Sequence, residues 1–199
     1  MRLLRKDISK LSDEALMQML GAGRSNEALT ELHARYSKKV LGFFIRMFQG
    51  DKDKAQDFVQ DLFLRILEKH HLFNPEKKFY TWMFTIASNM SKTSFRKIPD
   101  VRISEDDYEL NEHVQWNENG LDKHVFKEVL REAIENLEDH HRLSFVLRYI
   151  QELSIKDIAE ITDTSEGTVK SRLFYATKKI AKELEEFKPS QGGAIFKMN

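Results

Sequence analysis

Proline is scarce in this 199-residue sequence, and its scarcity constrains the fold more than any other feature. Prolines occur only at positions 75, 99 and 189. Because proline breaks helix interiors, the long intervals between these positions leave room for uninterrupted helices. Within the intervals, apolar residues recur with the helical period of about 3.6, and few runs alternate as strands do. The sequence therefore predicts an all-α protein.

Capping residues, glycines and a shift in composition divide the chain into two helical series. Helix starts at Ser12 and Asp51 and interruptions at Gly21 and Gly50 predict helices over 13–20, 26–48, 52–69 and 78–96. A second series is predicted over 122–136, 139–151, 155–161 and 165–186. Residues 98–122 are acidic and lack sustained periodicity, which predicts an extended linker. We therefore expect two small helical domains, 1–97 and 123–187, an acidic flexible linker at 98–122, and a flexible tail at 188–199.

Composition excludes several classes of protein and of site. A content of 41% apolar and 32% charged residues is typical of a soluble globular protein. No stretch approaches the roughly 20 apolar residues of a membrane span, and the first residues lack the apolar run of a signal peptide. We expect a cytoplasmic protein with no membrane insertion. The absence of cysteine excludes disulfides, thiolate zinc sites and cysteine nucleophiles.

The net charge of zero hides a strong asymmetry along the chain. Residues 1–99 hold 18 Lys and Arg against 11 Asp and Glu, residues 100–122 hold 1 against 8, and residues 123–199 hold 13 against 13. Within the last segment, 165–182 carries five basic residues and a single acid, Glu166. Two cationic surfaces therefore flank an acidic stretch, a pattern that indicates nucleic-acid binding.

The segment "LSIKDIAEITDTSEGTVKSRLFYATKKI" has the spacing of a helix-turn-helix motif. Ser154 and Asp157 form an expected capping pair, Ser165 is expected to cap the next helix, and Asp163 suits the left-handed turn between them. Val169 is expected to point into the shared core. A solvated helical hairpin is the alternative, but capping, turn and charge agree on the DNA-binding motif.

The second helix of this motif presents polar and aromatic side chains near its start, where such helices reach base edges in the major groove. Phe174 could equally belong to the core. The candidate DNA-binding residues are Lys170, Ser171, Arg172, Phe174, Tyr175 and, toward the phosphates, Lys178.

The stretch "KKFYTWMFTIASNMSKTSFRK" mixes a buried helix face with a candidate DNA surface. At 100° per residue, Phe79, Trp82, Met83, Ile86 and Met90 fall on one arc, which predicts core. Tyr80, Phe84 and Asn89 lie off the centre of that arc. The candidate DNA-binding residues are Lys78, Tyr80, Asn89, Lys92 and Arg96.

The order of these motifs resembles that of an extracytoplasmic-function (ECF) sigma factor of the sigma-70 superfamily. The resemblance rests on "AQDFVQDLFLRI", then "FYTWMFTIASN", an acidic linker, and "GTVKSRL", and it covers residues 12 to 186. It implies a non-enzymatic subunit, with no cofactor, that binds core RNA polymerase and promoter DNA and directs transcription initiation. Region 2 of that family would occupy the first domain, and region 4 the second.

The resemblance also assigns roles to residues. Asp57, Gln60, Asp61 and Phe63 match the helix that docks on the clamp coiled coil of the largest polymerase subunit, and the flap of the second-largest subunit is a further implied contact. The segment 70–89 matches the region that melts the minus-ten promoter element and holds an extruded base, with Asn89 as edge reader. The second helix of the helix-turn-helix matches the reader of the minus-thirty-five element. An anti-sigma factor is a further partner that the resemblance allows.

Two other functions compete with this interpretation. His70–His71 and His140–His141, with Glu68 and Asp139 nearby, could begin a metal site in an enzyme, but adjacent helical residues point about 100° apart and no HExxH spacing exists. An ordinary helix-turn-helix regulator that binds duplex DNA without polymerase would explain the second domain equally well. Only the motifs of the first domain favour the sigma factor.

Overall fold

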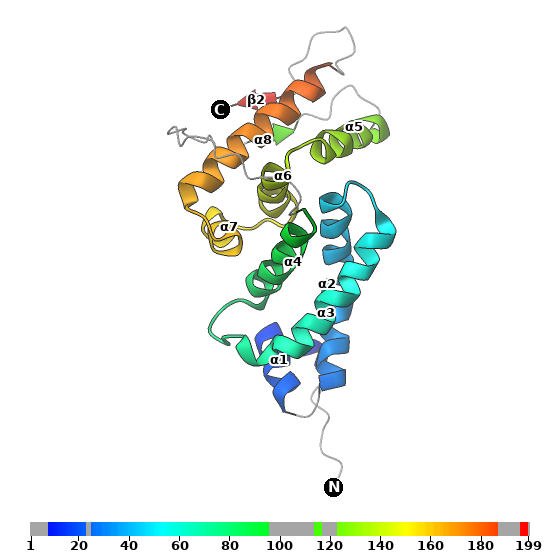
Figure 1. Cartoon of the computed structure of the whole chain (residues 1–199), viewed down its shortest axis with the longest axis vertical. Coiled ribbons are helices and arrows are strands. Elements are labelled where there is room, and N and C mark those ends of the chain that lie inside the picture. The colour runs from blue at the N-terminus through cyan, green and yellow to red at the C-terminus, as the bar shows by residue number, and fades with distance from the viewer. Residues whose placement is uncertain (1–7, 23–24, 96–113, 117–122, 187–195, 199) are drawn as a thin grey trace. The chain divides into compact units, whose positions relative to one another are not determined.

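The computed structural model describes residues 8–22, 25–95, 114–116, 123–186 and 196–198 of the chain. The chain divides into two units, Met1–Lys97 and Ile98–Asn199, and each is described by itself. Helices dominate both units (Figure 1), which confirms the predicted all-α class with two helical domains. Most of the predicted linker, 98–122, lies outside the described residues.

Among its described residues, the first unit contains four α-helices and two short 3-10 turns. The elements are η1 (Ile8–Lys10), α1 (Asp13–Gly21), α2 (Ser25–Met47), α3 (Lys52–Lys69), η2 (His70–Leu72) and α4 (Phe79–Phe95). Each predicted helix of this unit lies within one residue of the observed one at both ends. None of the helices in the described part of the chain has the length and apolar character that crossing a bilayer requires.

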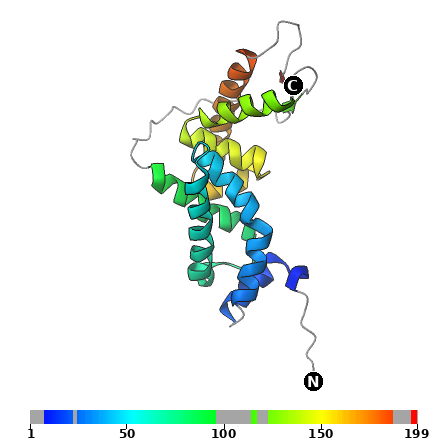
Figure 2. The same cartoon turned by 90° about the vertical axis from the view of Figure 1, so that its right-hand side faces the viewer.

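Local capping explains where these helices begin. The Ser12 hydroxyl accepts a hydrogen bond from the backbone of Ala15, and the Asp51 carboxylate accepts one from the backbone of Lys54. Between α2 and α3 the chain turns through Gln49 and Gly50, both with positive φ. Gly50 has φ 88°, a conformation that a side chain would disfavour. The turn folds α2 and α3 into a hairpin that both views show side by side (Figure 1 and Figure 2).

The first turn of α4 is capped by a side chain from α1. Glu14 accepts a hydrogen bond from the backbone nitrogen of Phe79 at 3.1 Å. The helix α1 is itself held on α2, because Asp13 accepts hydrogen bonds from the Tyr36 hydroxyl and, at 2.7 Å, from the Arg35 guanidinium. Phe79 is fully buried between these elements. The short helix α1 therefore fixes the start of α4.

The second unit is built around one long helix. Its elements are β1 (Val114–Trp116), α5 (Lys123–Glu135), α6 (Asp139–Phe145), the π-helical turn η3 (Val146–Ile150), α7 (Ile155–Thr162), α8 (Glu166–Glu186) and β2 (Phe196–Met198). Helix α8 packs against α5, α6 and α7. It buries an apolar stripe at helical spacing, which consists of Val169, Leu173, Ala176, Ile180 and Leu184.

Two features of this unit differ from the sequence expectation. The helix predicted over 139–151 changes to π-helical geometry at Val146, and the backbone of Gln151 donates to the Val146 carbonyl. Strands β1 and β2 pair antiparallel, with Val114 opposite Met198. Strands of three residues contain too few positions to show an alternating pattern, so periodicity could not have found them.

Candidate nucleic-acid interface

Helix α3 has three distinct faces. The buried face, which packs on α2, consists of Ala55, Val59, Leu62, Phe63 and Ile66. A second face is exposed and contains three acids, and a third contains three cations and faces α4. Residues three and four apart share a face of a helix, so the spacing of these residue types along the sequence produces all three faces.

The exposed acidic face of α3 includes two of the predicted polymerase-binding residues. We define this acidic face as Asp53, Asp57, Gln60, Leu64 and Glu68, all of which are exposed. Sequence reasoning missed Leu64, an apolar side chain that is 56% exposed. Its position away from the buried arc of α3 is a signal that could have found it.

Phe63, which was predicted to bind polymerase, does not lie on the surface of α3. Only 5% of it is exposed, and its ring lies 4.7 Å from that of His33 on α2. The buried face of α3 is wide enough to include it, and the ring of His33 packs against it. Phe63 therefore contributes to the core and not to the exposed surface of α3.

A groove of about 410 Å³ runs between α3 and α4, and we call it the basic groove. Its α3 wall is formed by Lys54, Phe58, Asp61, Arg65 and Lys69, and its α4 wall by Ile86, Asn89, Met90, Thr93 and Ser94. The groove brings together Asp61 and Asn89, which the sequence analysis assigned to different partners. Asn89 is exposed, whereas its neighbour Met90 is buried.

The basic groove has the chemistry of a single-stranded nucleic-acid site. Lys54, Arg65 and Lys69 outnumber the one carboxylate, Asp61, so the groove attracts phosphates. Asn89 offers an amide that can both donate and accept hydrogen bonds at a base edge. Sequence reasoning missed the three cations, although their spacing of eleven and four residues places them on one helix face.

The other predicted residues of α4 are spread around the helix. Lys78 is exposed just before its start and Lys92 is half-buried, while Arg96 lies outside the described residues. Tyr80 is half-buried, with its ring 4.9 Å from Phe84 and 5.9 Å from Tyr36. Phe84 is fully buried against Phe43 of α2, because α4 is covered on more of its surface than one arc suggests.

The helix-turn-helix of the second unit has the predicted caps and turn. Ser154 and Asp157 form a reciprocal capping box at the start of α7. Asp163 ends α7 in the left-handed conformation, with φ 56° and ψ 52°. The Ser165 hydroxyl accepts a hydrogen bond from the backbone of Thr168, and Val169 is fully buried. The predicted motif is confirmed.

The start of α8 presents its predicted residues to different degrees. Lys170 and Lys178 are exposed, whereas Ser171, Arg172, Phe174 and Tyr175 are half-buried. The ring of Tyr175 lies 6.0 Å from that of His141 on α6 and 5.5 Å from that of Phe174. Tyr175 therefore packs partly against its own unit, and Lys170 has the most freedom to reach a base.

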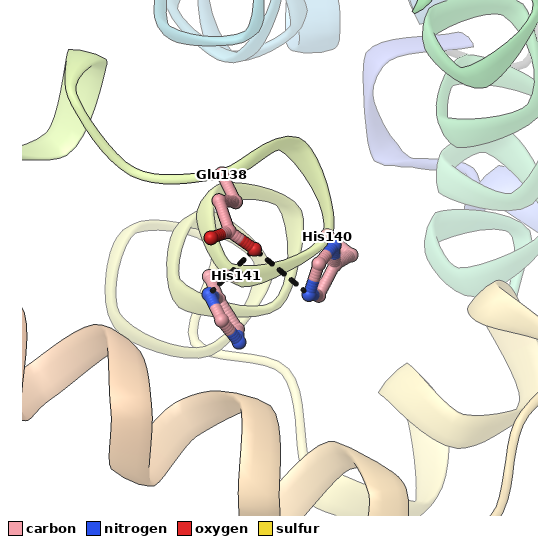
Figure 3. Close-up of side chains that lie close together, drawn as sticks. All are labelled: Glu138, His140 and His141. Carbon is pink, nitrogen blue, oxygen red and sulfur yellow. Dashed lines mark ion pairs between the residues drawn. The ribbon is translucent and has the colours of Figure 1, made fainter. Parts of the chain in front are cut away.

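The two histidine pairs differ in geometry. The rings of His70 and His71 are perpendicular, with centroids 5.8 Å apart. Those of His140 and His141 lie only 4.2 Å apart, and both face the carboxylate of Glu138 (Figure 3). The expectation that adjacent histidines diverge is therefore wrong for this second pair, whose rings both turn back toward the residue that precedes the helix.

Two solved structures with a similar fold are both complexes of two proteins. CnrH, solved with the cytosolic domain of CnrY, has a TM-score of 0.65 at 21% identity, over 88% of this chain and 99% of that one. RpoE of Bartonella quintana, solved with the anti-sigma factor NepR, has a TM-score of 0.60 at 23% identity, over 80% of this chain and 98% of that one. These similarities show the fold.

Sequence comparisons agree with the fold. The family model of sigma-70 region 2 matches residues 32–98, and that of sigma-70 region 4 matches residues 127–180. The ECF RNA polymerase sigma-E factor of Haemophilus influenzae is 31% identical over 88% of this chain and 97% of its own length. The RNA polymerase sigma-H factor of Pseudomonas aeruginosa is 28% identical over 89% and 96%. The two regions, in this order and along nearly the whole length of both relatives, show that the chain belongs to the ECF group of the sigma-70 family.

Proposed function

We propose that this sigma factor binds core RNA polymerase through the acidic face of α3 and directs promoter-specific initiation through the basic groove and the start of α8. It performs no catalysis of its own, and it acts in the cytoplasm, where bacterial transcription takes place. The observation that carries the proposal is the charge pattern of α3, whose acidic face and cationic face lie roughly a third of a turn apart. One helix can therefore contact a protein and a nucleic acid at the same time.

The acidic face suits a basic protein surface. Asp57 and Gln60 are exposed within one turn, and Leu64 adds an apolar side chain one turn further. An exposed apolar residue ringed by polar ones is typical of a protein–protein interface, where the apolar group supplies affinity and the charges fix the orientation. We propose the clamp coiled coil of the largest polymerase subunit as this partner, with the flap of the second-largest subunit as a further contact.

The basic groove suits the melted strand of the minus-ten element. Its volume falls in the range of pockets that hold small molecules, which is enough for an unstacked nucleotide. Arg65 and Lys69 on one wall would bind phosphates, while Asn89 on the other would read the base edge. Asp61 adds an acceptor that can favour a base with an exocyclic amine.

The start of α8 suits the duplex of the minus-thirty-five element. Lys170 is exposed in the second turn of α8, near the helix start where recognition helices contact base edges, and Lys178 is exposed two turns further along. We propose Lys170 and Ser171 as base readers and Lys178 as a phosphate contact. Tyr175 and Phe174 would contribute through the parts of their rings that remain accessible.

A reconstitution experiment tests the proposal. Purified chain is mixed with bacterial core RNA polymerase, the complex is isolated by size exclusion, and transcription from a promoter library is measured. We expect co-elution with the core enzyme and initiation at a defined set of promoters, with no duplex binding by the chain alone at physiological salt. A chain that ignores the core enzyme but binds a duplex site unaided would instead be a helix-turn-helix regulator.

A further inference from the structure

The loop before α6 orients an acid toward two histidines. Glu138 is the N-cap residue of α6, with extended backbone angles, but its side chain makes no capping hydrogen bond. Shorter N-cap side chains bond to the backbone of the second and third helical residues. The longer Glu138 side chain instead reaches the imidazoles at those two positions, His140 and His141. This local geometry explains how neighbouring histidines come to face the same carboxylate.

The three donor atoms are spaced almost as ligands of one small metal ion are. The Glu138 carboxylate oxygen lies 3.5 Å from Nε2 of His140 and 3.7 Å from Nδ1 of His141, and all three atoms lie within 4.8 Å of one another (Figure 3). In a tetrahedral zinc site with bonds of about 2.0–2.1 Å, ligand atoms are about 3.3–3.4 Å apart. Small side-chain rotations would therefore close the cluster around an ion.

His141 lacks the contacts that a structural histidine usually has. It is only 7% exposed, and its Nε2 has no hydrogen-bond partner among the residues that the structure describes. Its Nδ1 is too far from Glu138 for a hydrogen bond. The Nδ1 atom instead faces the same carboxylate oxygen as Nε2 of His140 does, which places it on the side of the ring where an ion could bind.

We propose that Glu138, His140 and His141 bind a Zn²⁺ ion, with water as the fourth ligand. Exposure decreases from Glu138 through His140 to the buried His141, so an ion can enter from solvent while one ligand is held rigidly. Two imidazoles and one carboxylate form a donor set that zinc uses in proteins. Only one of the three ligands is a carboxylate, so Mg²⁺ and Ca²⁺, which prefer oxygen ligands, should not bind.

Zinc at this position would reach the DNA-reading helix through packing. The ring of His141 lies against Tyr175 of α8, and Lys179 of α8 donates a hydrogen bond to the Asn136 carbonyl just before the site. An ion that fixes His141 would therefore stiffen the contact between α6 and α8. The binding site itself depends only on the three ligands and is independent of the proposed promoter function.

Zinc binding by the full chain tests the inference. The metal-free chain at pH 7.5 is titrated with Zn²⁺ in competition with a chromogenic chelator, and thermal unfolding is followed in parallel. We expect one equivalent of zinc that excess Mg²⁺ does not displace, together with a raised melting temperature. Glu138→Gln and His140→Ala should each lose this equivalent, whereas His33→Ala, in the first unit, should keep it.

The ligating atoms are tested separately by long-range ¹H–¹⁵N NMR of the histidine rings. Zinc should shift Nε2 of His140 and Nδ1 of His141, because these are the atoms that face Glu138. The NMR spectra of Glu138→Gln and His140→Ala without zinc also show whether each variant is folded. Absence of zinc binding, zinc retained by both folded variants, or shifts confined to other histidines would overturn the proposal.

Discussion

Asn89 and Met90 are adjacent on α4 and both line the basic groove, so substituting each by alanine separates base reading from stability. Asn89 is exposed, and its main-chain carbonyl accepts a hydrogen bond from Thr93 that alanine would keep. Asn89→Ala should therefore change the free energy of unfolding by less than about 0.5 kcal/mol. Met90 is only 7% exposed, and Met90→Ala should destabilise the unit by about 2–4 kcal/mol.

For promoter discrimination the order of the two variants should be the opposite, with the larger effect from Asn89→Ala. If Asn89 reads the edge of an extruded base, its loss should reduce discrimination between the preferred base and the others by about 1–3 kcal/mol. Since about 1.4 kcal/mol corresponds to a factor of ten, this is roughly a fivefold to 150-fold loss. Met90→Ala has no such contact to lose, and at a temperature where it remains folded it should keep the parent's preference.

Open-complex formation with core RNA polymerase provides the assay. Four promoters that differ only at the extruded position of the minus-ten element are compared for each variant, and urea unfolding is measured on the same preparations. Asn89 is not the base reader if Asn89→Ala unfolds the unit, or if the variant keeps the base preference of the parent. The basic groove would then be only a gap in the packing of α3 against α4, and other residues would read the base.

Three other predictions concern different surfaces. Asp57→Arg should weaken binding to core polymerase by several kcal/mol without changing the melting temperature, because Asp57 is exposed on the acidic face of α3. Equal affinity of this variant in a fluorescence titration would remove Asp57 from the interface. Lys170→Ala should change the minus-thirty-five sequences recovered by selection. Lys178→Ala should weaken binding to all sequences alike and should reduce the slope of log affinity against log salt concentration by about one. Because the pKa of buried His141 is lowered from 6.5 to about 4, the unfolded chain binds this proton more tightly, and stability should fall as pH decreases from about 6.5 to 4. Urea unfolding in EDTA across this range should show a flatter profile for His141→Gln.

The helix-turn-helix was predictable because its determinants are local. The capping box joins Ser154 to Asp157, three residues away, and the turn depends on the left-handed conformation of Asp163 alone. The capping box and the turn each stabilise the same helix-turn-helix, so the sequence pattern and the fold agree. The starts of α1 and α3 were predictable for the same reason, since Ser12 and Asp51 cap them from within one turn.

The basic groove and the core assignments were not predictable in the same way, because they depend on contacts between distant elements. The periodicity of one helix cannot reveal that His33 covers Phe63, or that Phe43 covers Phe84. Asp61 and Asn89 meet only when α3 packs against α4. The cluster at Glu138 was missed for a different reason: side chains in a first helical turn can bend back toward the preceding loop, and a helical wheel does not include that freedom.

The hydrogen bond between Glu14 and the backbone of Phe79 has a consequence for synthesis. The two residues are 65 positions apart, so at roughly 5–20 residues per second the acceptor emerges several seconds before its donor. During this interval α1, with nine residues, is too short to be stable alone. The apolar side chains that α4 later covers, Phe43 among them, are accessible to chaperones and proteases. Nascent chains stalled before residue 79 should therefore be degraded rapidly, and resistance to proteolysis should appear only when α4 has left the ribosome.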